Sequence, residues 1–340
     1  MDKSVIFAVA GSGKTTLLIE RLTENSRTLI LTHTVNNETH LRTKIINRFG
    51  LIPNGIRVMT WFEFLHCFCF RPFLQEQLAT RGLNFSQPQL RLPRTNPLHY
   101  QDSRGRLYHR RLAQLLTARG MLPNICNRLA RYYEEVLVDE VQDFAGHDFN
   151  FLLALCNADV SMLFAGDFYQ HTFDTSRDGN VNSTLHDNIT HYEARFEAAG
   201  VTIDRETLSR TWRCSTTACE FITGQLSIRI DAHGTHSTLI ETVTDPEHVD
   251  ALHADHSVIK LFYSEHHRYY CQSLNWGASK GLDHFHDVCI VMGAKHWRLL
   301  NRQELHALPP SSRNKLYVAC SRARGNIYFV PEIHLRKFKR

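Results

Sequence analysis

A glycine-rich segment near residue 10 constrains the fold of this chain more than any other feature. Residues 8–16 read Ala-Val-Ala-Gly-Ser-Gly-Lys-Thr-Thr. The pattern predicts a buried strand at residues 5–9, a turn at 11–13 and a helix at 14–22. A strand, a glycine turn and a helix in this order make a phosphate-binding loop, in which backbone N–H groups at the helix start hold phosphate oxygens. The strict motif begins with glycine where this chain has Ala8, but the GSGKT part is intact.

This loop predicts a binding site for ATP with Mg²⁺. Lys14 would reach the β- and γ-phosphates, and the Thr15 hydroxyl would face Mg²⁺. The residues expected to hold the nucleotide here are Ala10, Gly11, Ser12, Gly13, Lys14, Thr15 and Thr16.

A second motif supplies the groups that hydrolysis needs. Leu137-Val138-Asp139-Glu140 is an apolar run that ends in two acids. Asp139 would hold the hydrated Mg²⁺ and Glu140 would polarise the attacking water. Alone, such a run also fits a strand that ends in a solvated acidic loop. Together with the phosphate loop, it indicates a nucleotidase.

Strand and helix patterns alternate along the rest of the chain, which predicts an α/β protein with parallel sheets. A length of 340 residues with 43% hydrophobic residues fits two domains. The stretch at 61–73 is predicted to be a core helix rather than a base-stacking platform, and 84–106 a loop or a small excursion rather than regular core. Further strands are predicted at 28–32, 58–60, 136–139, 162–165, 257–262, 288–292 and 327–330, and helices at 38–49, 110–118, 125–133 and 214–226.

Charge is distributed unevenly, although the net charge is only +5. The segment from Arg71 to Arg131 holds eleven Arg, no Lys and two acids, whereas Glu134 to Asp204 holds fourteen acids and two Arg. This asymmetry predicts a segment that faces a polyanion next to one that faces a metal ion. A solvated arginine-rich face is the alternative.

Other bulk features predict a cytoplasmic protein without a membrane segment. No run of 18 apolar residues occurs, and the first residues do not form a signal peptide. The nine cysteines lack paired CxxC spacing, so we expect reduced, mostly buried thiols rather than a zinc site or disulfides.

The sequence resembles superfamily 1 DNA helicases of the UvrD, Rep and PcrA kind over almost the whole chain. Besides the phosphate loop, seven segments match the family's motifs in order and near their spacing. They are Thr32-His33-Thr34 with Leu41 and Lys44-Ile45, Thr60-Trp61-Phe62, Asp139-Glu140-Val141-Gln142-Asp143, and the segments at 164–170, 208–213, 278–283 and 316–324. Of these, the segment at 164–170 resembles the family's third motif, 278–283 its fifth and 316–324 its sixth. The resemblance implies two RecA-like P-loop domains, 1–203 with an arginine-rich insertion at about 71–131, and 204–340, with the nucleotide in the interdomain cleft.

The resemblance also implies roles for individual residues. Gln142 would position nucleotide and water, and Gln170 would sense the γ-phosphate. Arg213 and Arg322 would be arginine fingers, which makes them catalytic together with Lys14, Glu140 and Gln170. Trp212 would stack on adenine, and Gly281 and Asp283 would lie at the ribose. The expected DNA contacts are Thr32, Thr34, Asn36, Thr60, Trp61, Phe173 and Ser279.

This chain departs from the family pattern in several places. Only Met1 to Ala8 precede the phosphate loop, where the family usually carries a short helix with a glutamine that reads the adenine edge, so base selectivity should be loose. Thr175 occupies the position of the second of two aromatic residues that stack on DNA bases in the family. We therefore expect DNA binding to be weaker or to use other residues. Gly277 and Asn275 replace the histidine and threonine of the fifth motif. The spacings at 73–134 and 213–279 leave almost no room for the family's accessory domains.

Three functions fit these patterns. The first is an ATP-driven translocase on single-stranded or partly duplex DNA that unwinds duplexes, 3′→5′ as in the family, alone or with a partner, in repair, replication or defence against foreign DNA. The second is a helicase-derived nucleotide switch that regulates a partner protein such as a nuclease. The third is a motor on RNA, because a channel that tracks the backbone distinguishes sugars only by contacting the 2′-OH.

Overall fold

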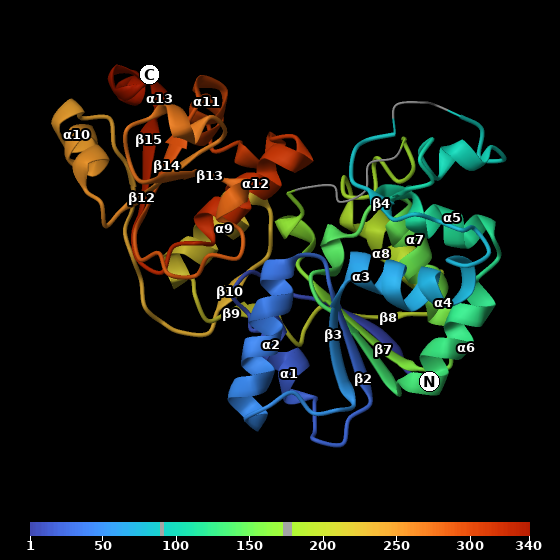
Figure 1. Ribbon diagram of the computed structural model, residues 1–340. Helices are drawn as coiled ribbons and strands as arrows, with labels where there is room; N and C mark the ends of the chain where they lie inside the picture. The colour runs from blue at the N-terminus through green and yellow to red at the C-terminus, as the bar shows by residue number, and fades with distance from the viewer. Residues whose placement is uncertain (89–91, 173–178) are drawn as a thin grey trace. The chain divides into compact units, whose positions relative to one another are not determined.

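The computed structural model describes residues 1–88, 92–172 and 179–340, which form two compact units (Figure 1). The first unit comprises Met1–Ile6, Lys14–Gly166 and the described part of Phe173–Asp204, and the second comprises Phe7–Gly13, Asp167–Thr172 and Arg205–Arg340. Each unit is built on a parallel sheet with helices, which confirms the α/β fold class.

The first unit contains a six-stranded sheet in the order β3-β2-β6-β7-β1-β8. Strands β2, β6 and β7 are almost fully buried, as expected for the inner strands of a parallel sheet covered on both faces, and Figure 1 shows helices on both sides of it. Ligands of such sheets bind at the carboxyl ends of the strands. The strands are β1 (Lys3–Phe7), β2 (Thr28–Thr32), β3 (Ile56–Thr60), β6 (Glu135–Val138), β7 (Ser161–Gly166) and β8 (Thr202–Asp204).

The helices of the first unit begin and end at local capping signals. Helix α2 starts at Thr34, whose side chain accepts from the Asn37 N–H, and stops at Gly50, which has a left-handed φ of 78°. The segment at 61–74 is helical and largely buried, as predicted, but its middle is a π-helix, η1 (Phe64–Phe70). The helices are α1 (Lys14–Glu20), α2 (Val35–Phe49), α3 (Trp61–Glu63), α4 (Arg71–Leu74), α5 (Leu112–Ala118), α6 (Leu122–Tyr132), α7 (Gly146–Ala154) and α8 (Ile189–Glu197).

The arginine-rich segment forms a small excursion rather than a long loop. Two short strands, β4 (Leu83–Asn84) and β5 (Leu107–Tyr108), pair in parallel within it. Inside the excursion, the buried His99 ring lies 2.8 Å from the Gln114 side-chain oxygen. Its polar groups are therefore fastened to helix α5 rather than left to solvent.

The second unit contains a five-stranded parallel sheet in the order β11-β15-β14-β12-β13. Helices α9 and α12 pack on it around an apolar core that includes Trp276 and Tyr317. The strands are β11 (Ile240–Thr242), β12 (Ile259–Phe262), β13 (Ser273–Asn275), β14 (Val288–Met292) and β15 (Ile327–Pro331), with a separate parallel pair of β9 (Arg210–Thr211) and β10 (Asp231–Ala232). The helices are α9 (Thr216–Leu226), α10 (Pro246–Ala254), α11 (Ala294–Asn301), α12 (Pro310–Cys320) and α13 (Glu332–Leu335).

Short 3₁₀ turns complete both units. They are η2 (Pro97–His99), η3 (His109–Arg111), η4 (Val141–Asp143), η5 (Leu155–Asn157), η6 (Phe168–Gln170), η7 (His266–Arg268), η8 (Gly277–Ser279), η9 (Leu305–Ala307) and η10 (Arg336–Phe338). Over the residues that the structure describes, every helix is too short or too polar to cross a bilayer.

Candidate nucleotide-binding site

The phosphate loop lies between the end of β1 and the start of α1, as predicted, although β1 ends at Phe7 rather than at residue 9. Gly11 and Gly13 have left-handed φ values of 72° and 96°. The Ser12 hydroxyl donates to the Val9 carbonyl at 2.8 Å, which closes the turn. Glycine is needed at both positions because other residues rarely adopt this backbone conformation.

The loop is packed against β9 and the residues on either side of it. The Trp212 N–H donates to the Gly11 carbonyl at 3.0 Å, and the Val9 N–H donates to the Leu208 carbonyl at 3.0 Å. A Cβ atom on Gly11 would come within 2.8 Å of both Arg213 Cβ and Thr211 Oγ1. The first predicted arginine finger therefore lies directly beside the loop that is predicted to cradle phosphate.

The acidic motif meets the loop helix within the first unit. Thr15 Oγ1 lies 3.5 Å from Asp139 Oδ2, so the two predicted Mg²⁺ ligands face each other from α1 and from the end of β6. Hydroxyl and carboxylate oxygens are the ligands that Mg²⁺ takes in nucleotide sites. The residues present therefore fit the ion. Lys14 is buried at the start of α1, whereas the side chain of Thr16 is exposed.

Glu140 is held in an unusual backbone conformation next to Asp139. Its φ of 55° is left-handed, and its N–H donates to Asp139 Oδ1 at 3.0 Å. The side-chain nitrogen of the buried Gln142 donates to the Glu140 carboxylate. A Cβ on Gly166 would come within 2.4 Å of Gln142 Oε1, so glycine at the end of β7 leaves space for this glutamine. Non-glycine residues with such φ values concentrate at functional sites.

Both predicted arginine fingers bind one carboxylate in the second unit. Arg213 donates to Asp283 Oδ1 at 2.5 Å, and Arg322 lies 3.4 Å from the same oxygen. Arg322 is 1% exposed, and burial together with the charge of Arg213 lowers its pKa to about 10. Asp283 is 57% exposed, so solvent reaches the anion that neutralises the pair. The resemblance places Asp283 at the ribose, but here it holds the arginines.

A buried hydrogen-bond chain joins the phosphate loop to the third motif, and its central residue was not predicted. The Tyr317 hydroxyl accepts from the Ala10 N–H at 2.9 Å and donates to Asp167 Oδ2 at 2.8 Å. Asp167 also accepts from the Gln170 side chain at 2.9 Å. Burial and the neighbouring Asp167 raise the pKa of Tyr317, which keeps its hydroxyl protonated. A tyrosine within the apolar run at 316–320 was the available signal, because a buried tyrosine needs a hydrogen-bond partner.

Trp212 is positioned for stacking. Its side chain is 70% exposed, although its backbone is bonded to Gly11 of the phosphate loop. One face of its ring stacks on His233, with 3.7 Å between ring centroids and 13° between planes. His233 was not predicted, because only the pairing of β9 with β10 brings it here. Gly281, also expected at the ribose, has a left-handed φ of 80° two residues before Asp283.

The residues predicted to contact DNA fall into two groups. Thr34 and Asn36 are exposed at the start of α2. By contrast, Thr32 and Ser279 are fully buried, and Thr60 is buried while its hydroxyl accepts from the Glu63 N–H to cap α3. Phe173 lies outside the described residues.

The prediction of a DNA contact by the Trp61 side chain is not supported. The ring packs on Phe64 and Phe144 at centroid distances of 5.4 and 5.0 Å and is fully buried. The turn from β3 into α3 directs the ring into the core, where burial of so large an apolar group stabilises the unit.

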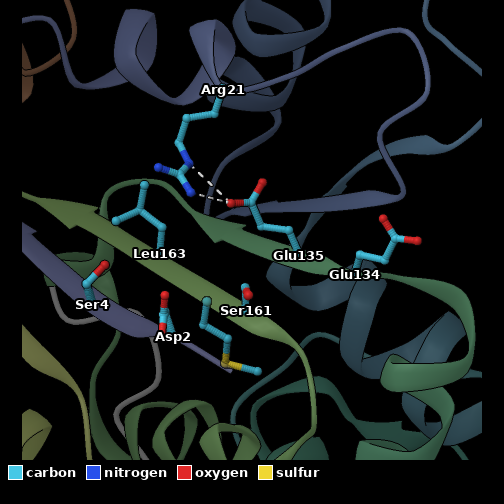
Figure 2. A pocket seen from close by; sticks show the side chains of 8 residues that line it. Asp2, Ser4, Arg21, Glu134, Glu135, Ser161 and Leu163 are labelled. Atoms are coloured by element: carbon cyan, nitrogen blue, oxygen red, sulfur yellow. Dashed lines mark hydrogen bonds and ion pairs between the residues drawn. The ribbon is translucent and has the colours of Figure 1, made fainter.

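The first unit also has a hollow that does not belong to this site. It is lined by residues at the start of β6 and β7 and near the start of β1, including Glu135, Ser161 and Ser4. Figure 2 shows Arg21 above it, donating to Glu135 Oε1 from both Nε at 3.1 Å and Nη2 at 2.8 Å. This is the amino edge of the sheet, opposite to the edge where the phosphate loop begins.

Comparison with known proteins places the fold. No protein-family model and no curated protein match the chain. Among solved structures, the complex of Arterivirus nonstructural protein 10 (helicase) with DNA is similar, with a TM-score of 0.51 and 15% identity over 96% of this chain and 60% of that chain. The chain therefore shares the fold of this helicase.

A second arterivirus structure is less similar. The PRRSV helicase matches with a TM-score of 0.49 and 14% identity, over 99% of this chain and 54% of that chain. This chain therefore spans only about 60% of the length of the first helicase and 54% of the second.

Proposed function

We propose that this chain is an ATP-hydrolysing motor of the superfamily 1 DNA helicase type, of the UvrD, Rep and PcrA kind, that moves on single-stranded DNA and unwinds duplexes. Movement would be 3′→5′, in repair, replication or defence against foreign DNA, alone or with a partner protein. One observation carries the proposal: Arg213 lies against Gly11 of the phosphate loop and shares a carboxylate with the buried Arg322.

The bound nucleotide would lie at the phosphate loop. Backbone N–H groups of the loop would hold its phosphates at the start of α1. Lys14 would contact the β- and γ-phosphates, and Trp212, backed by His233, would stack on the base. Thr15 and Asp139 would hold Mg²⁺, which neutralises charge on the phosphate oxygens.

Hydrolysis would use groups that the chain already orients. Glu140 would accept a proton from the attacking water, and Gln142 fixes the Glu140 carboxylate by its hydrogen bond. Arg213 and Arg322 would exchange the Asp283 carboxylate for γ-phosphate oxygens, which offer more negative charge. When phosphate leaves, the arginines would return to Asp283. The two arginines would thus bind phosphate while ATP is present and Asp283 after phosphate has left.

The series of hydrogen bonds from Ala10 through Tyr317 and Asp167 to Gln170 would transmit the change at the phosphate loop to the third motif. Each of its hydrogen bonds is 2.8 to 2.9 Å long and buried, so a shift of the loop cannot leave Gln170 unaffected without breaking one of them. Exposed residues at the start of α2, including Thr34 and Asn36, would contact the strand on which the motor moves.

Steady-state ATP hydrolysis with and without single-stranded DNA tests the proposal. We expect hydrolysis that single-stranded DNA stimulates many-fold and that Lys14→Ala and Glu140→Gln abolish, whereas Glu140→Gln still binds ATP. A single-stranded RNA of the same sequence tests the sugar preference. A wild-type rate in Lys14→Ala would overturn the proposal.

A nucleotide switch that regulates a partner such as a nuclease is the second candidate. The span of 65 residues between Arg213 and Ser279 is filled by elements of the second unit itself, so a separate accessory domain is missing from this part of the described chain. Hydrolysis that ignores both DNA and RNA, together with nucleotide-dependent binding to a partner, would favour the switch over the motor.

A further inference from the structure

Four aromatic rings form a cluster near the arginine-rich excursion of the first unit. Phe62 belongs to α3, His66 to η1 and His109 to η3, and Phe85 directly follows β4. The Phe85 ring lies 5.5 Å from Phe62 and 5.0 Å from His109, and Phe62 lies 6.0 Å from both His66 and His109, as measured between centroids. We call these four residues the ring cluster.

The ring cluster is partly open to solvent. Phe85 is 63% exposed, and the other three rings are half-buried. A phenylalanine that served only the core would be buried, because each square ångström of apolar surface left in water forgoes roughly 25 cal/mol. Phe85 is instead held at the surface by ring contacts with its face available.

The charge around the ring cluster suits a polyanion. Burial and the neighbouring Arg71 lower the pKa of His66, and burial lowers the pKa of His109, so both rings favour the neutral form. Arg110 makes no ion pair with any residue that the structure describes, and its Nε has no hydrogen-bond partner there. Of the two acids between residues 71 and 131, Asp102 is already paired with Arg106.

We propose that Phe85, Phe62 and His109 form a stacking site for an unpaired base of a single-stranded nucleic acid, with Arg71 and Arg110 contacting its phosphates. Aromatic rings bind bases of any sequence through their π-faces, and arginines supply the backbone contacts. This inference rests on the proposed function and identifies one surface through which the motor would bind its single-stranded nucleic acid. It also offers a replacement for the stacking aromatic that Thr175 does not provide.

Binding of dye-labelled oligonucleotides of about 20 residues, oligo-dT and oligo-U, measured by anisotropy, tests the site. Phe85→Ala should weaken binding by roughly 5- to 100-fold, the equivalent of one lost stack, and Phe85→Trp should restore it. Leu98→Ala, which truncates another exposed apolar side chain of the excursion, should bind as the wild type does. Equal loss for both oligonucleotides indicates base stacking alone, and loss for one only adds a sugar contact.

The arginine contribution has its own signature. Arg110→Ala should weaken binding and reduce the slope of log affinity against log salt by about one. Phe85→Ala should leave that slope unchanged, because stacking releases no counterions.

The outcomes separate this inference from the proposed function. Phe85→Ala affinity within about twofold of wild type overturns the inference while the motor stands, provided that the wild type binds and hydrolyses ATP. Loss of binding in Phe85→Ala without any ATP hydrolysis by the wild type supports the stacking site and overturns the motor. A wild type that binds neither oligonucleotide overturns both. The midpoint of thermal unfolding of Phe85→Ala should match that of the wild type, because the side chain is exposed, and this shows that the variant is folded.

Discussion

Tyr317 and Ala10, 307 positions apart in the chain, are joined by a hydrogen bond of 2.9 Å from the Ala10 N–H to the tyrosine hydroxyl. The same hydroxyl donates to Asp167, so a single buried oxygen connects the phosphate loop with the third motif. A backbone N–H in the core costs free energy unless it has a partner, and here the partner comes from helix α12.

Tyr317→Phe keeps the ring and removes this oxygen. We expect the free energy of unfolding to fall by about 1–3 kcal/mol, because the Ala10 N–H is left without its acceptor. Stimulation of ATP hydrolysis by single-stranded DNA should fall more than the basal rate, because Gln170 loses its link to the loop. Thermal unfolding and steady-state kinetics measure both effects. Tyr270→Phe, which alters an exposed tyrosine, is the control. If single-stranded DNA stimulates ATP hydrolysis by Tyr317→Phe as strongly as by the wild type, Tyr317 has only a structural role.

Gly11→Ala, compared with Gly50→Ala, distinguishes the effect of a steric clash from that of backbone strain. The new Cβ would lie 2.8 Å from Arg213 Cβ, so the loop and the arginine could not keep their places. We expect loss of ATP binding, measured with a fluorescent ATP analogue. Gly50→Ala is the matched control, because Gly50 has a similar φ of 78° but open space where a Cβ atom would lie. It should cost about 1–2 kcal/mol in stability and leave ATP binding intact. Equal ATP affinity in both variants would contradict the packing of Arg213 on the loop.

Trp212→Ala tests the stacking role of the exposed ring beside His233. A base–aromatic stack is worth ~1–3 kcal/mol, so KM for ATP should rise by about tenfold or more while kcat changes little. Trp212→Phe should recover most of the affinity. A KM equal to that of the wild type would show that the nucleotide base lies elsewhere.

Asp102 makes the arginine-rich excursion sensitive to acid. Hydrogen bonds from the backbone N–H and the side chain of Arg106, and from Arg104 and Asn84, lower the pKa of Asp102 from 3.8 to about 2. A carboxyl with a depressed pKa in the folded state contributes stability above its unfolded pKa, and this stability is lost as the pH falls toward the folded value. We therefore expect amide exchange at residues 100–108 to accelerate, relative to the intrinsic rate, between pH 4 and pH 2. Asp102→Asn should lose most of this pH dependence, and an unchanged profile would count against the role of the carboxylate.

Much of the fold could be predicted because its signals are local. Strands β2 and β14 have the predicted bounds, since each is a short buried run with an apolar centre and a polar residue or glycine directly beyond each end. The phosphate loop could be predicted for the same reason. Periodicity did not reveal α12, whose buried face includes Asn314 and Ser312 as well as apolar residues.

The site could be predicted only as far as single motifs allow. The neighbourhood of Thr15 and Asp139 follows from two strand ends that share one sheet edge. The pairing of Arg213 and Arg322 with Asp283 depends on three segments that meet only in the folded second unit. Trp61 was placed at the DNA by motif position, whereas its side-chain direction is decided by packing against Phe144.

The central claim is that hydrolysis requires Arg213, held against the phosphate loop, as well as Lys14 and Glu140. The most direct test is the steady-state ATPase rate of Arg213→Ala at saturating single-stranded DNA, compared with wild type. Loss of an arginine finger costs roughly 10³-fold or more in rate, so we predict turnover that is nearly abolished. An Arg213→Ala variant that hydrolyses ATP at the wild-type rate would contradict the account.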